Sequence, residues 1–539
     1  MEAMNNNKFM PLLPTKSPIQ TEICRKNVTA ELSADYTLPD YQPEIKKLHR
    51  VTVNVIPPTQ FVGSGSAEFS GTLDYSLLYS DNDGKLCLAV ISDDYSFSMP
   101  FEKGADGGDP SLDPELLCFA DVASDSVNAR VVAPRRVAIR CRLRAKVSAF
   151  GTDAPECTVS GTSAHDVIEK LEGTVGVNCV MRGESELLTL GDEIVSDSNP
   201  SAALSGGSEI RIIMPEVCVF VSEANASDGY VSCRGDAIVK ILMCREDPEG
   251  EPYSITKKLP FSTTVEIDGI GTGCECRAYG RVHDISVSNE EGRILCEVGV
   301  SIIAEAQKNT ELCYVKDIYS TESDCECSIK EQSYPTALRC FSGNLTGGGT
   351  LTFEELGIEP GSVLIDCSAL SSSVESVVLD KGKYIVSGNC RYSLLMNLGA
   401  EAFSKECTLP FRYETDARSD VSECEYDATA EVISVRCRTD AEKAVIDSEI
   451  FVTARLFGTN KIRAVTEAMF AAGSEAAEKA EESKKSTFTV CYPDKSDTLW
   501  SVGKKYHAEL AALAERNGLR SIDNADSTDS IKDVKYLLI

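Results

Sequence analysis

The chain has 539 residues, of which 42% are hydrophobic, and this length predicts three to four domains with substantial cores. Its 84 acidic and 53 basic residues give a net charge of -31, which would repel phosphate backbones and anionic lipids and so argues against binding to nucleic acid or membranes. Residues 1–27 lack an apolar stretch of signal-peptide length, and no apolar run is long enough to cross a bilayer. We therefore expect no membrane insertion and a protein that stays in the compartment where it is made.

Three copies of one pattern organise the chain between its N-terminal extension and its tail. Each copy has a segment of alternating polarity that begins at a glycine, followed by a polar turn and a Pro-Phe pair. The copies begin at residues 71, 235 and 388, so the period is the size of a domain and far longer than a solenoid repeat. The glycines are Gly71, Gly235 and Gly388, and the pairs are Pro100-Phe101, Pro260-Phe261 and Pro410-Phe411.

Each copy continues with long segments of alternating polarity, at 128–150, 276–306 and 425–457. Their period of two and their content of Val and Ile predict antiparallel strands with one solvated face. Helical patterns are sparse in this part of the chain. They are confined to two short stretches, at 164–171 and 353–356.

The fold class expected from these patterns is mainly β. The repeat predicts three tandem antiparallel β-sandwich-like domains, followed by a small C-terminal βααβ module. Residues 463–486, which are rich in Ala, Glu and Lys, are expected to be a linker, either a partly helical tether or a plain flexible one. The expected bounds are 1–27 for an N-terminal extension, 28–185, 186–330 and 331–462 for the three domains, and 487–539 for the module.

The last part of the chain, 487–539, reads as one compact unit. A strand is expected at 487–492, then a turn and a helix whose first N–H groups Ser496 or Asp497 would cap. A second helix is expected at 508–516, because its apolar residues recur at helical spacing before the Asn-Gly stop that follows. A closing strand at 534–539 completes the βααβ order.

This unit resembles a LysM module. The resemblance rests on D-T-L-W-S-V-G-K-K-Y (497–506) and on Asn517-Gly518-Leu519, which follow a short strand and turn. The family binds N-acetylglucosamine polymers such as peptidoglycan in a shallow groove. The chain departs from the family at Ser496, where a glycine usually precedes the Asp, and in its closing strand. Both departures affect the loops of the groove more than the fold.

The repeats resemble those of clostridial spore-coat morphogenetic proteins, in which tandem SPOCS (DUF3794) repeats precede a C-terminal LysM module. The resemblance rests on Y-T-L-P-D-Y-Q-P-E-I-K-K-L-H-R (36–50), on L-C-Y-V-K-D-I-Y-S (312–320) and above all on the domain order. Residues 328–387 depart most from the pattern. The resemblance implies a protein of the mother-cell cytoplasm that acts at the forespore surface and in the spore coat.

The 22 cysteines are too sparse in so long a chain to indicate a disulfide scaffold, and no secretory signal accompanies them. Reduced thiols are expected, and many of them, such as Cys218, should act as small hydrophobic residues. The pairs Cys274-x-Cys276 and Cys325-x-Cys327 would each place two thiols on one face of a strand. A structural role is favoured over metal binding, because the pairs lack C-x-x-C partners and the chain has only 4 His.

The sequence contains no recognisable catalytic motif. Nucleotide-binding glycine patterns, G-x-S-x-G and H-E-x-x-H are absent, and the glycine cluster at 269–273 reads as a turn. The histidines stand apart from one another, and acidic pairs such as Asp93-Asp94 fall in expected turns. We therefore expect no enzymatic activity, no catalytic residue, no metal site and no cofactor.

The tail contains the candidate recognition residues. Trp500, the only tryptophan, lies one position off the inner helical face, so it should be partly exposed and either cap the small core or anchor an interface. Lys495, Lys504 and Lys505 form a basic patch that is either simply solvated or steers an acidic partner. The candidate partner- or glycan-binding residues are Asp494, Lys495, Ser496, Asp497, Thr498, Trp500, Lys504, Asn517, Gly518, Leu519 and Arg520.

Three functions of different classes are consistent with these observations. In the first, the protein is a non-enzymatic scaffold for the spore coat, and the resemblance implies that its tail docks onto the basement-layer ATPase of the coat, stage IV sporulation protein A. In the second, it binds peptidoglycan through the loops at 494–498 and 517–520. In the third, it is a cell-wall hydrolase targeted by its tail. The missing export signal, the altered groove loops and the lack of a catalytic pattern favour the scaffold.

Overall fold

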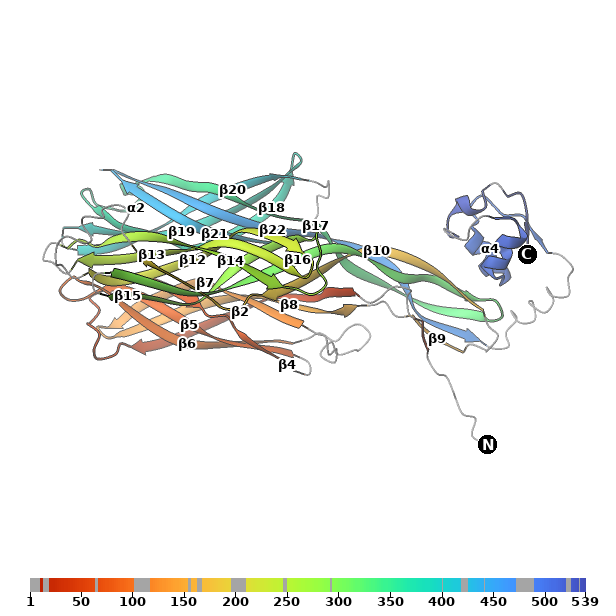
Figure 1. Ribbon diagram of the computed structural model, residues 1–539, viewed down its shortest axis with the longest axis horizontal. Coiled ribbons are helices and arrows are strands. Elements are labelled where there is room, and N and C mark those ends of the chain that lie inside the picture. The colour runs from red at the N-terminus through yellow and green to blue at the C-terminus, as the bar shows by residue number, and fades with distance from the viewer. Residues whose placement is uncertain are drawn as a thin grey trace, which may run out of the picture.

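The structure, a computed structural model, is built almost entirely from antiparallel strands, with a few short helices (Figure 1). The mainly β fold expected from the alternating patterns is therefore confirmed. No helix among the described residues is long and apolar enough to cross a membrane. The structure describes residues 10–12, 19–63, 66–100, 117–153, 157–161, 167–194, 210–245, 250–290, 293–399, 401–417, 425–440, 442–471, 489–519, 525–532 and 534–539.

Residues 19–153 form a first pair of sheets. In one sheet β5 pairs with β3, β4 and β6, and in the other β8 pairs with β2 and β7. Alternation along β8 turns Ile139 and Leu143 into the core between the sheets, whereas Arg140 and Arg142 face solvent. The strands are β2 (Ile19–Thr37), β3 (Lys47–Val55), β4 (Thr59–Gly63), β5 (Ser66–Ser80), β6 (Leu86–Pro100), β7 (Leu117–Ala133) and β8 (Arg136–Asp153).

Residues 168–320 form a second pair of sheets with the same plan. One sheet has the order β12-β13-β14, and in the other β16 pairs with β10, β11 and β15. Val239 and Ile241 of β13 meet Val298 and Val300 of β16 in the core between them. The strands are β10 (Ile168–Glu184), β11 (Leu188–Ile194), β12 (Ile210–Ser227), β13 (Tyr230–Arg245), β14 (Tyr253–Glu266), β15 (Glu275–Glu290) and β16 (Arg293–Ser320).

Residues 324–471 form the third pair. One sheet has the order β18-β19-β20, and in the other β22 pairs with β17 and β21. Tyr392 and Leu394 pack against Ile446 and Val452 in its core. The short helix expected at 353–356 is present as α2. The elements are β17 (Asp324–Thr352), α2 (Phe353–Leu356), β18 (Val363–Asp380), β19 (Lys383–Leu398), β20 (Glu401–Asp416), β21 (Glu425–Thr439) and β22 (Lys443–Ala471).

A glycine opposite an aromatic residue marks the same place in the second and third pairs of sheets. Gly235 lies opposite Phe261, and Gly388 lies opposite Phe411. A Cβ atom at Gly388 would come within 2.0 Å of the carbonyl oxygen of Ser373 and 2.7 Å of the ring of Phe411. The close approach of backbone and ring therefore requires glycine at this position.

The first pair of sheets has the same glycine but a different partner from the one expected. Gly71 lies opposite Tyr95, whose ring a Cβ atom would approach to 2.7 Å. Pro100 is opposite Ser66 at the end of the strand, and Phe101 lies outside the described residues. Tyr95 thus takes the structural place that the sequence pattern assigned to Phe101. Strand register, and not the Pro-Phe motif, determines which residues of the three pairs of sheets are structurally equivalent.

β-Bulges also recur at corresponding places in the three pairs of sheets. A bulge inserts one residue and re-aims the strand, so matching bulges in strands of unlike sequence indicate a common architecture. They interrupt the first strand of the sheets centred on β5, β13 and β19 and the edge strand of each second sheet. The register shifts fall at Leu48/Arg50, Ile212/Met214 and Leu364/Asp366, and at Ser124/Ser126, Val282/Asp284 and Val432/Ser434.

The three pairs of sheets close into a ring. β6 of the first pair contacts β12 of the second, β14 contacts β18 of the third, and β20 returns to contact β3 of the first. Each contact therefore joins the last strand of one sheet to the first strand of the next. Ser404 of β20 donates a hydrogen bond to the carbonyl oxygen of His49 in β3, between residues 355 positions apart.

A buried ion network fixes the three pairs relative to one another on the side of the second sheets. Asp427 in β21 receives Arg277 of β15 at 2.6 Å and Lys146 of β8 at 2.5 Å, so that each pair of sheets supplies one charge. Glu305 in β16 receives Arg277 at 2.6 Å and Arg182 at 3.2 Å. Because an unpaired buried charge is strongly destabilising, this network favours one arrangement of the ring.

The longest strands extend beyond the ring as an arm. β10 and β16 stay paired to the ends at Ile168 and Ser320, and β17 and β22 stay paired to Asp324 and Ala471. Val315, Val465 and Phe470 pack between these two ribbons. The arm consists of residues 168–175, 312–320, 324–334 and 460–471, joined by β9 (Cys157–Ser160), which pairs with β22 in parallel, and by β1 (Met10–Leu12), which pairs with β9.

The arm accounts for several differences from the sequence predictions. Residues 168–171, expected to be helical, begin β10, while 164–166 lie outside the described residues. The apolar residues of this stretch recur at helical spacing, but pairing with β16 makes residues 168–171 a strand, because tertiary pairing overrides so short a local pattern. Because β10 pairs with β16, the second pair of sheets begins at Ile168 and not after residue 185.

Two further boundaries differ for the same reason. β17 begins at Asp324 and runs through the boundary expected at 330. β22 continues to Ala471, so the start of the expected linker, 463–471, is strand paired with β17. Residues 472–486, the rest of that linker, lie outside the described residues. These long strands stay paired to their ends, and sequence composition alone does not mark where a pairing ends.

Candidate functional site

The C-terminal unit has the expected order of strand, helix, helix and strand. β23 and β24 pair antiparallel, and both are shorter than the strands predicted at 487–492 and 534–539. Leu499 and Val502 of the first helix, Leu513 of the second and Leu537 of the last strand form its core. The elements are β23 (Val490–Cys491), α4 (Leu499–Tyr506), α5 (Leu510–Arg516), the 3-10 turn η2 (Thr528–Ser530) and β24 (Leu537–Leu538).

Thr498 caps the first helix of the unit, in place of Ser496 or Asp497. The hydroxyl of Thr498 accepts a hydrogen bond from the backbone N–H of Ser501 at 3.0 Å, and the Ser501 hydroxyl accepts one from the N–H of Thr498 at 2.9 Å. Asp497 instead accepts a hydrogen bond from the N–H of Asp494 at 2.8 Å. The preference of Ser, Asp and Thr for helix starts is similar, so the sequence did not distinguish among them.

The two loops predicted to form a groove use their side chains differently. Asp494, Lys495 and Ser496 are exposed. Asn517 is directed inward, where its amide donates to the carbonyl oxygens of Leu513 and Leu538 at 2.8 Å each. Asn517 thus joins α5 to β24.

The remaining groove residues follow directly after this asparagine. Gly518 has a φ of 65°, as the expected helix stop requires, and Leu519 is half-buried. The backbone N–H of Gly518 donates to the carbonyl oxygen of Glu515 at 3.1 Å, which closes the turn. Arg520 lies outside the described residues.

Trp500 and Lys504 face the arm and share one carboxylate there. The indole Nε1 of Trp500 donates to Asp317 Oδ2 at 2.8 Å, and Lys504 Nζ lies 2.6 Å from Asp317 Oδ1. The indole also packs edge to face against the ring of Tyr319, with the ring centres 4.9 Å apart. Trp500 is only 5% exposed as a result, so the expectation of a partly exposed tryptophan is wrong.

The Trp500 side chain is buried because a separate part of the chain covers it. The helical pattern placed it one position off the inner face of the unit, and no local pattern indicated that Tyr319 of β16 would join the same buried cluster. Asp317 and Tyr319 are therefore functional candidates that the prediction missed. Their stretch, 312–320, contributed only to the family resemblance, because an acid two residues before an aromatic in a strand is common.

A glycine permits the close contact between the helix and the arm. A Cβ atom at Gly503 would lie 2.6 Å from the hydroxyl oxygen of Tyr319 and 2.8 Å from Leu510 Cδ2. The hydroxyl of Tyr319 instead donates to the carbonyl oxygen of Ala508 at 2.7 Å. Burial raises the pKa of Tyr319, and Glu169 and Glu509 raise it further, so the hydroxyl stays a donor.

Further polar contacts surround this central one. The ring Nδ1 of His507 lies 2.8 Å from the carbonyl oxygen of Ser320, and the N–H of Leu510 donates to Glu169 at 3.0 Å. Lys316 pairs with Asp526 at 2.7 Å. A bulge in the pairing of β10 with β16 falls between Leu171 and Glu172, opposite Lys316. The bulge lets the consecutive residues 316 and 317 both reach the unit.

Two thiols lie close together on the arm. Cys325 Sγ and Cys327 Sγ are 3.3 Å apart, which confirms that this pair shares one face of its strand. The hydrogen bond between them lowers the pKa of Cys327 to about 7, although burial opposes that shift. Among the described residues, no three His, Cys, Asp or Glu side chains come together as potential metal ligands.

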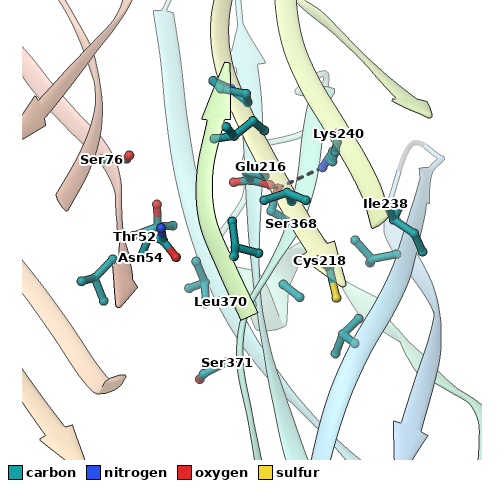
Figure 2. Close-up of a pocket in the computed structure, with 18 of the residues that line it drawn as sticks. Thr52, Asn54, Ser76, Glu216, Cys218, Ile238, Lys240, Ser368, Leu370 and Ser371 are labelled. Carbon is teal, nitrogen blue, oxygen red and sulfur yellow. Dashed lines mark hydrogen bonds between the residues drawn. The ribbon is translucent and has the colours of Figure 1, made fainter. Parts of the chain in front are cut away.

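The ring encloses a cavity of about 710 Å³ at its centre, lined by strands from all three pairs of sheets. Figure 2 shows Thr52 and Asn54 of β3, Glu216 of β12 and Ser368 of β18 around it. Ser368 donates to Glu216 at 2.7 Å and receives Lys240 at 2.9 Å. Ser368, Glu216 and Lys240 are therefore hydrogen-bonded within this wall of the cavity.

The same wall continues into a buried ion cluster. Arg50 of β3 pairs with Glu216 of β12 and with Asp366 of β18, each at 3.0 Å, and Lys240 reaches Asp366 at 2.5 Å. Burial by itself would raise the pKa of Asp366, but Lys240 and Arg50 outweigh it and hold the pKa at about 2. Each pair of sheets contributes a charge, so this cluster stabilises the ring on the side of the sheets that contain β3, β12 and β18.

One segment of the chain matches a known protein family. Residues 210–290 match the family described as SipL, SPOCS domain. This segment spans β12 to β15, so it covers the complete three-stranded sheet of the second pair and the edge strand of its second sheet. No match was found among curated proteins or among solved structures.

Proposed function

We propose that this protein is a non-enzymatic scaffold of spore-coat assembly that works in the mother cell at the forespore surface. The observation that carries the proposal is the match of residues 210–290 to the SipL, SPOCS domain family, which suggests an association with sporulation. The repeated glycine–aromatic pairs and bulges support the view that all three pairs of sheets are SPOCS-like β-sandwich repeats. The ring would then present three related outer surfaces to other coat components.

In this proposal the C-terminal unit is a LysM-like module that binds a protein. Trp500 and Lys504 lie on one face of α4 and are able to hold a carboxylate and an aromatic ring, as they do with Asp317 and Tyr319. Asn517, a groove residue, is engaged in contacts within the unit, which disfavours glycan binding through it. The partner proposed from the family resemblance is the coat ATPase, stage IV sporulation protein A.

The polar groups of the central cavity support a structural role over a catalytic one. Glu216, Asp366 and Lys240 are already paired with one another or with Arg50. The low pKa of Asp366 keeps it ionised near neutral pH, so it is poorly suited to act as a general acid. We therefore assign this cluster to holding the ring together.

Affinity purification from sporulating cells tests the proposal. The full chain, a chain that ends at residue 486 and the Trp500→Glu variant would each serve as bait, with purified stage IV sporulation protein A as a direct binding control. We expect the full chain to capture the ATPase, and the shortened chain and Trp500→Glu not to capture it. The Lys505→Ala variant is the matched control, because Lys505 is exposed on the same helix and points over Tyr506.

Peptidoglycan binding is the second candidate, since the loop at Asp494, Lys495 and Ser496 is open to solvent. Retention of the full chain on insoluble peptidoglycan, without capture of the ATPase, would favour that function and overturn the scaffold proposal. Release of soluble muropeptides by the full chain would show hydrolase activity and contradict the assignment as a non-enzyme.

A further inference from the structure

The contact between α4 and the arm has the form of a recognition site that is already filled. Asp317 places its carboxylate between the indole N–H of Trp500 and the ammonium group of Lys504, at 2.8 Å and 2.6 Å. Two residues later, Tyr319 supplies a ring to the same indole and is only 2% exposed. Residues i and i+2 of a strand point to one face, so an extended segment makes both contacts at once.

We propose that this face of α4 recognises an extended protein segment with a carboxylate two residues before an aromatic side chain, and that residues 317–319 of the arm occupy the face in competition with the partner. The inference rests on the proposed function, because it specifies what the protein-binding unit binds. The partner segment supplies an acidic residue that contacts Lys504 and the indole N–H. It also supplies an aromatic ring that packs edge to face against the indole.

Lys504 and Trp500 together account for the requirement of a carboxylate. A carboxylate has two oxygens, and here Oδ1 faces Lys504 while Oδ2 accepts from the indole and also lies 2.8 Å from Lys504 Nζ. An amide in the same place would present an N–H₂ group to one of these donors. A segment with Asn in place of Asp should therefore bind weakly or not at all.

Gly503 accounts for the requirement of an aromatic residue at the second position. It leaves room for the Tyr319 hydroxyl, which would lie 2.6 Å from a Cβ atom at that position. The hydroxyl reaches past the glycine to donate to the carbonyl oxygen of Ala508 at 2.7 Å. Tyrosine therefore fits the face better than phenylalanine, which lacks this hydrogen bond.

The C-terminal unit has the means to leave the arm without unfolding. Its core consists of its own residues, among them Leu499, Val502 and Leu513, and the arm adds only Tyr319 and, at the edge, Leu171. The segment 472–488 joins the unit to β22, and a chain of that length spans at most roughly 60 Å. The unit can thus undock while β22 keeps its place in the arm.

Competition predicts a specific effect on affinity. When the arm fills the face, the apparent dissociation constant for a partner is the intrinsic one divided by the fraction of molecules with an open face. Removing the Asp317 carboxylate raises that fraction and leaves the α4 side of the site intact. The Asp317→Ala variant should therefore bind the partner more tightly than the natural chain, whereas Lys504→Ala should bind it less tightly.

The chain contains its own reporter for this test. Trp500 is the only tryptophan, so tryptophan fluorescence of the full chain reports on this face alone. We expect a shift of the emission to longer wavelength in Asp317→Ala, because the indole becomes exposed to water. Glu297→Ala is the matched control, since Glu297 is exposed on the same strand, far from the C-terminal unit in sequence, and its removal should leave the emission unchanged.

A synthetic peptide tests the recognised chemistry directly. The peptide V-K-D-I-Y-S, identical to residues 315–320, should shift the emission of Asp317→Ala back toward that of the natural chain. The peptide V-K-N-I-Y-S should not, and V-K-D-I-F-S should bind less tightly. None of the three peptides should change the emission of the natural chain at the same concentration, because its face is filled. Equal effects of the Asp and Asn peptides would overturn the proposal.

Binding of the coat ATPase is the second part of the test. We expect at least fivefold tighter binding of the purified ATPase to Asp317→Ala than to the natural chain. Equal or weaker binding would overturn the competition, as would an unchanged emission in Asp317→Ala. If the ATPase binds no variant while the peptide still distinguishes Asp from Asn, the choice of partner in the proposed function is wrong and the recognised segment is supported.

Discussion

Asp317 of the arm accepts a hydrogen bond from the indole of Trp500 at 2.8 Å, although the two residues lie 183 positions apart in the chain. The contact joins the unit that resembles LysM to the sheet system that contains the SPOCS match. Any change at Trp500 therefore alters the position of the unit as well as its binding face. Comparison with variants of Asp317, which affect the docked state alone, separates the two effects of a change at Trp500.

Replacing Gly503 by alanine should loosen the C-terminal unit from the arm. The new Cβ atom would lie 2.6 Å from the Tyr319 hydroxyl, and forced overpacking costs about 1–3 kcal/mol, more than the gain of up to about 1 kcal/mol in helix propensity. Faster hydrogen exchange of the 312–320 amides should reveal the change. Adding Tyr319→Phe should restore part of the protection, and no change in exchange would contradict the contact.

Gly388→Ala should severely destabilise the third pair of sheets. The added Cβ atom would meet the backbone carbonyl oxygen of Ser373 at 2.0 Å, which only a backbone shift relieves, so we expect a loss above about 3 kcal/mol in the free energy of unfolding. The urea midpoint measures it. Gly176→Ala is the control, because nothing lies within 4 Å of a Cβ there, and equal losses in both variants would disprove the register.

His49 should make the ring less stable in mild acid. Burial, helped by Lys47 and Arg50, lowers the pKa of His49 from 6.5 to about 4. The unfolded chain takes up a proton below pH 6.5 that the folded chain refuses until about pH 4, so stability falls across this window by at most about 3 kcal/mol. The difference in unfolding free energy between pH 7 and pH 4.5 should be smaller in His49→Gln than in the natural chain.

Asp366→Asn should weaken the cohesion of the three pairs of sheets. The change leaves Arg50 and Lys240 buried with too little negative charge, and breaking such a pair costs about 3–5 kcal/mol. We expect a lower urea midpoint and more than one unfolding transition. Glu223→Gln, which removes an exposed pair with Arg234, is the control and should cost less than about 1 kcal/mol.

The same carboxylate should govern stability at low pH. Its pKa of about 2 lies below the ordinary value of 3.8, so its contribution is complete above about pH 4 and is lost as the pH falls toward 2. The natural chain should therefore lose more unfolding free energy between pH 4 and pH 2 than Asp366→Asn loses. Identical losses in the two proteins would show that the Asp366 carboxylate does not support the ring.

Local patterns in the sequence identified the strands but not their arrangement. The period of two over 128–150 predicted the inward and outward faces of β8, because alternation is a property of each strand by itself. The ring depends on pairs such as Arg50 with Asp366, which are 316 positions apart and carry no local signal. The same limit explains Tyr95, whose equivalence to Phe261 and Phe411 is visible only from strand register.

The candidate site was predicted only on the side of the C-terminal unit. Trp500 was identified because a lone tryptophan is conspicuous, and Lys504 because it belongs to a basic patch on an acidic protein. Asp317 and Tyr319 were missed, since ordinary residues in a strand acquire a role only through the tertiary contact. The cap at Thr498 was misplaced because three neighbouring residues had similar capping ability.

The closing contact of the ring, between Ser404 of β20 and His49 of β3, has a consequence for biosynthesis. The first pair of sheets to leave the ribosome has to wait for its last neighbour, 355 positions later, and until then the outer edge of β3 has no neighbouring sheet. Exposed strand edges invite pairing with other chains, and contacts so distant in sequence form slowly. Chains stalled before residue 404 should therefore aggregate or engage chaperones, whereas chains released after that point should not.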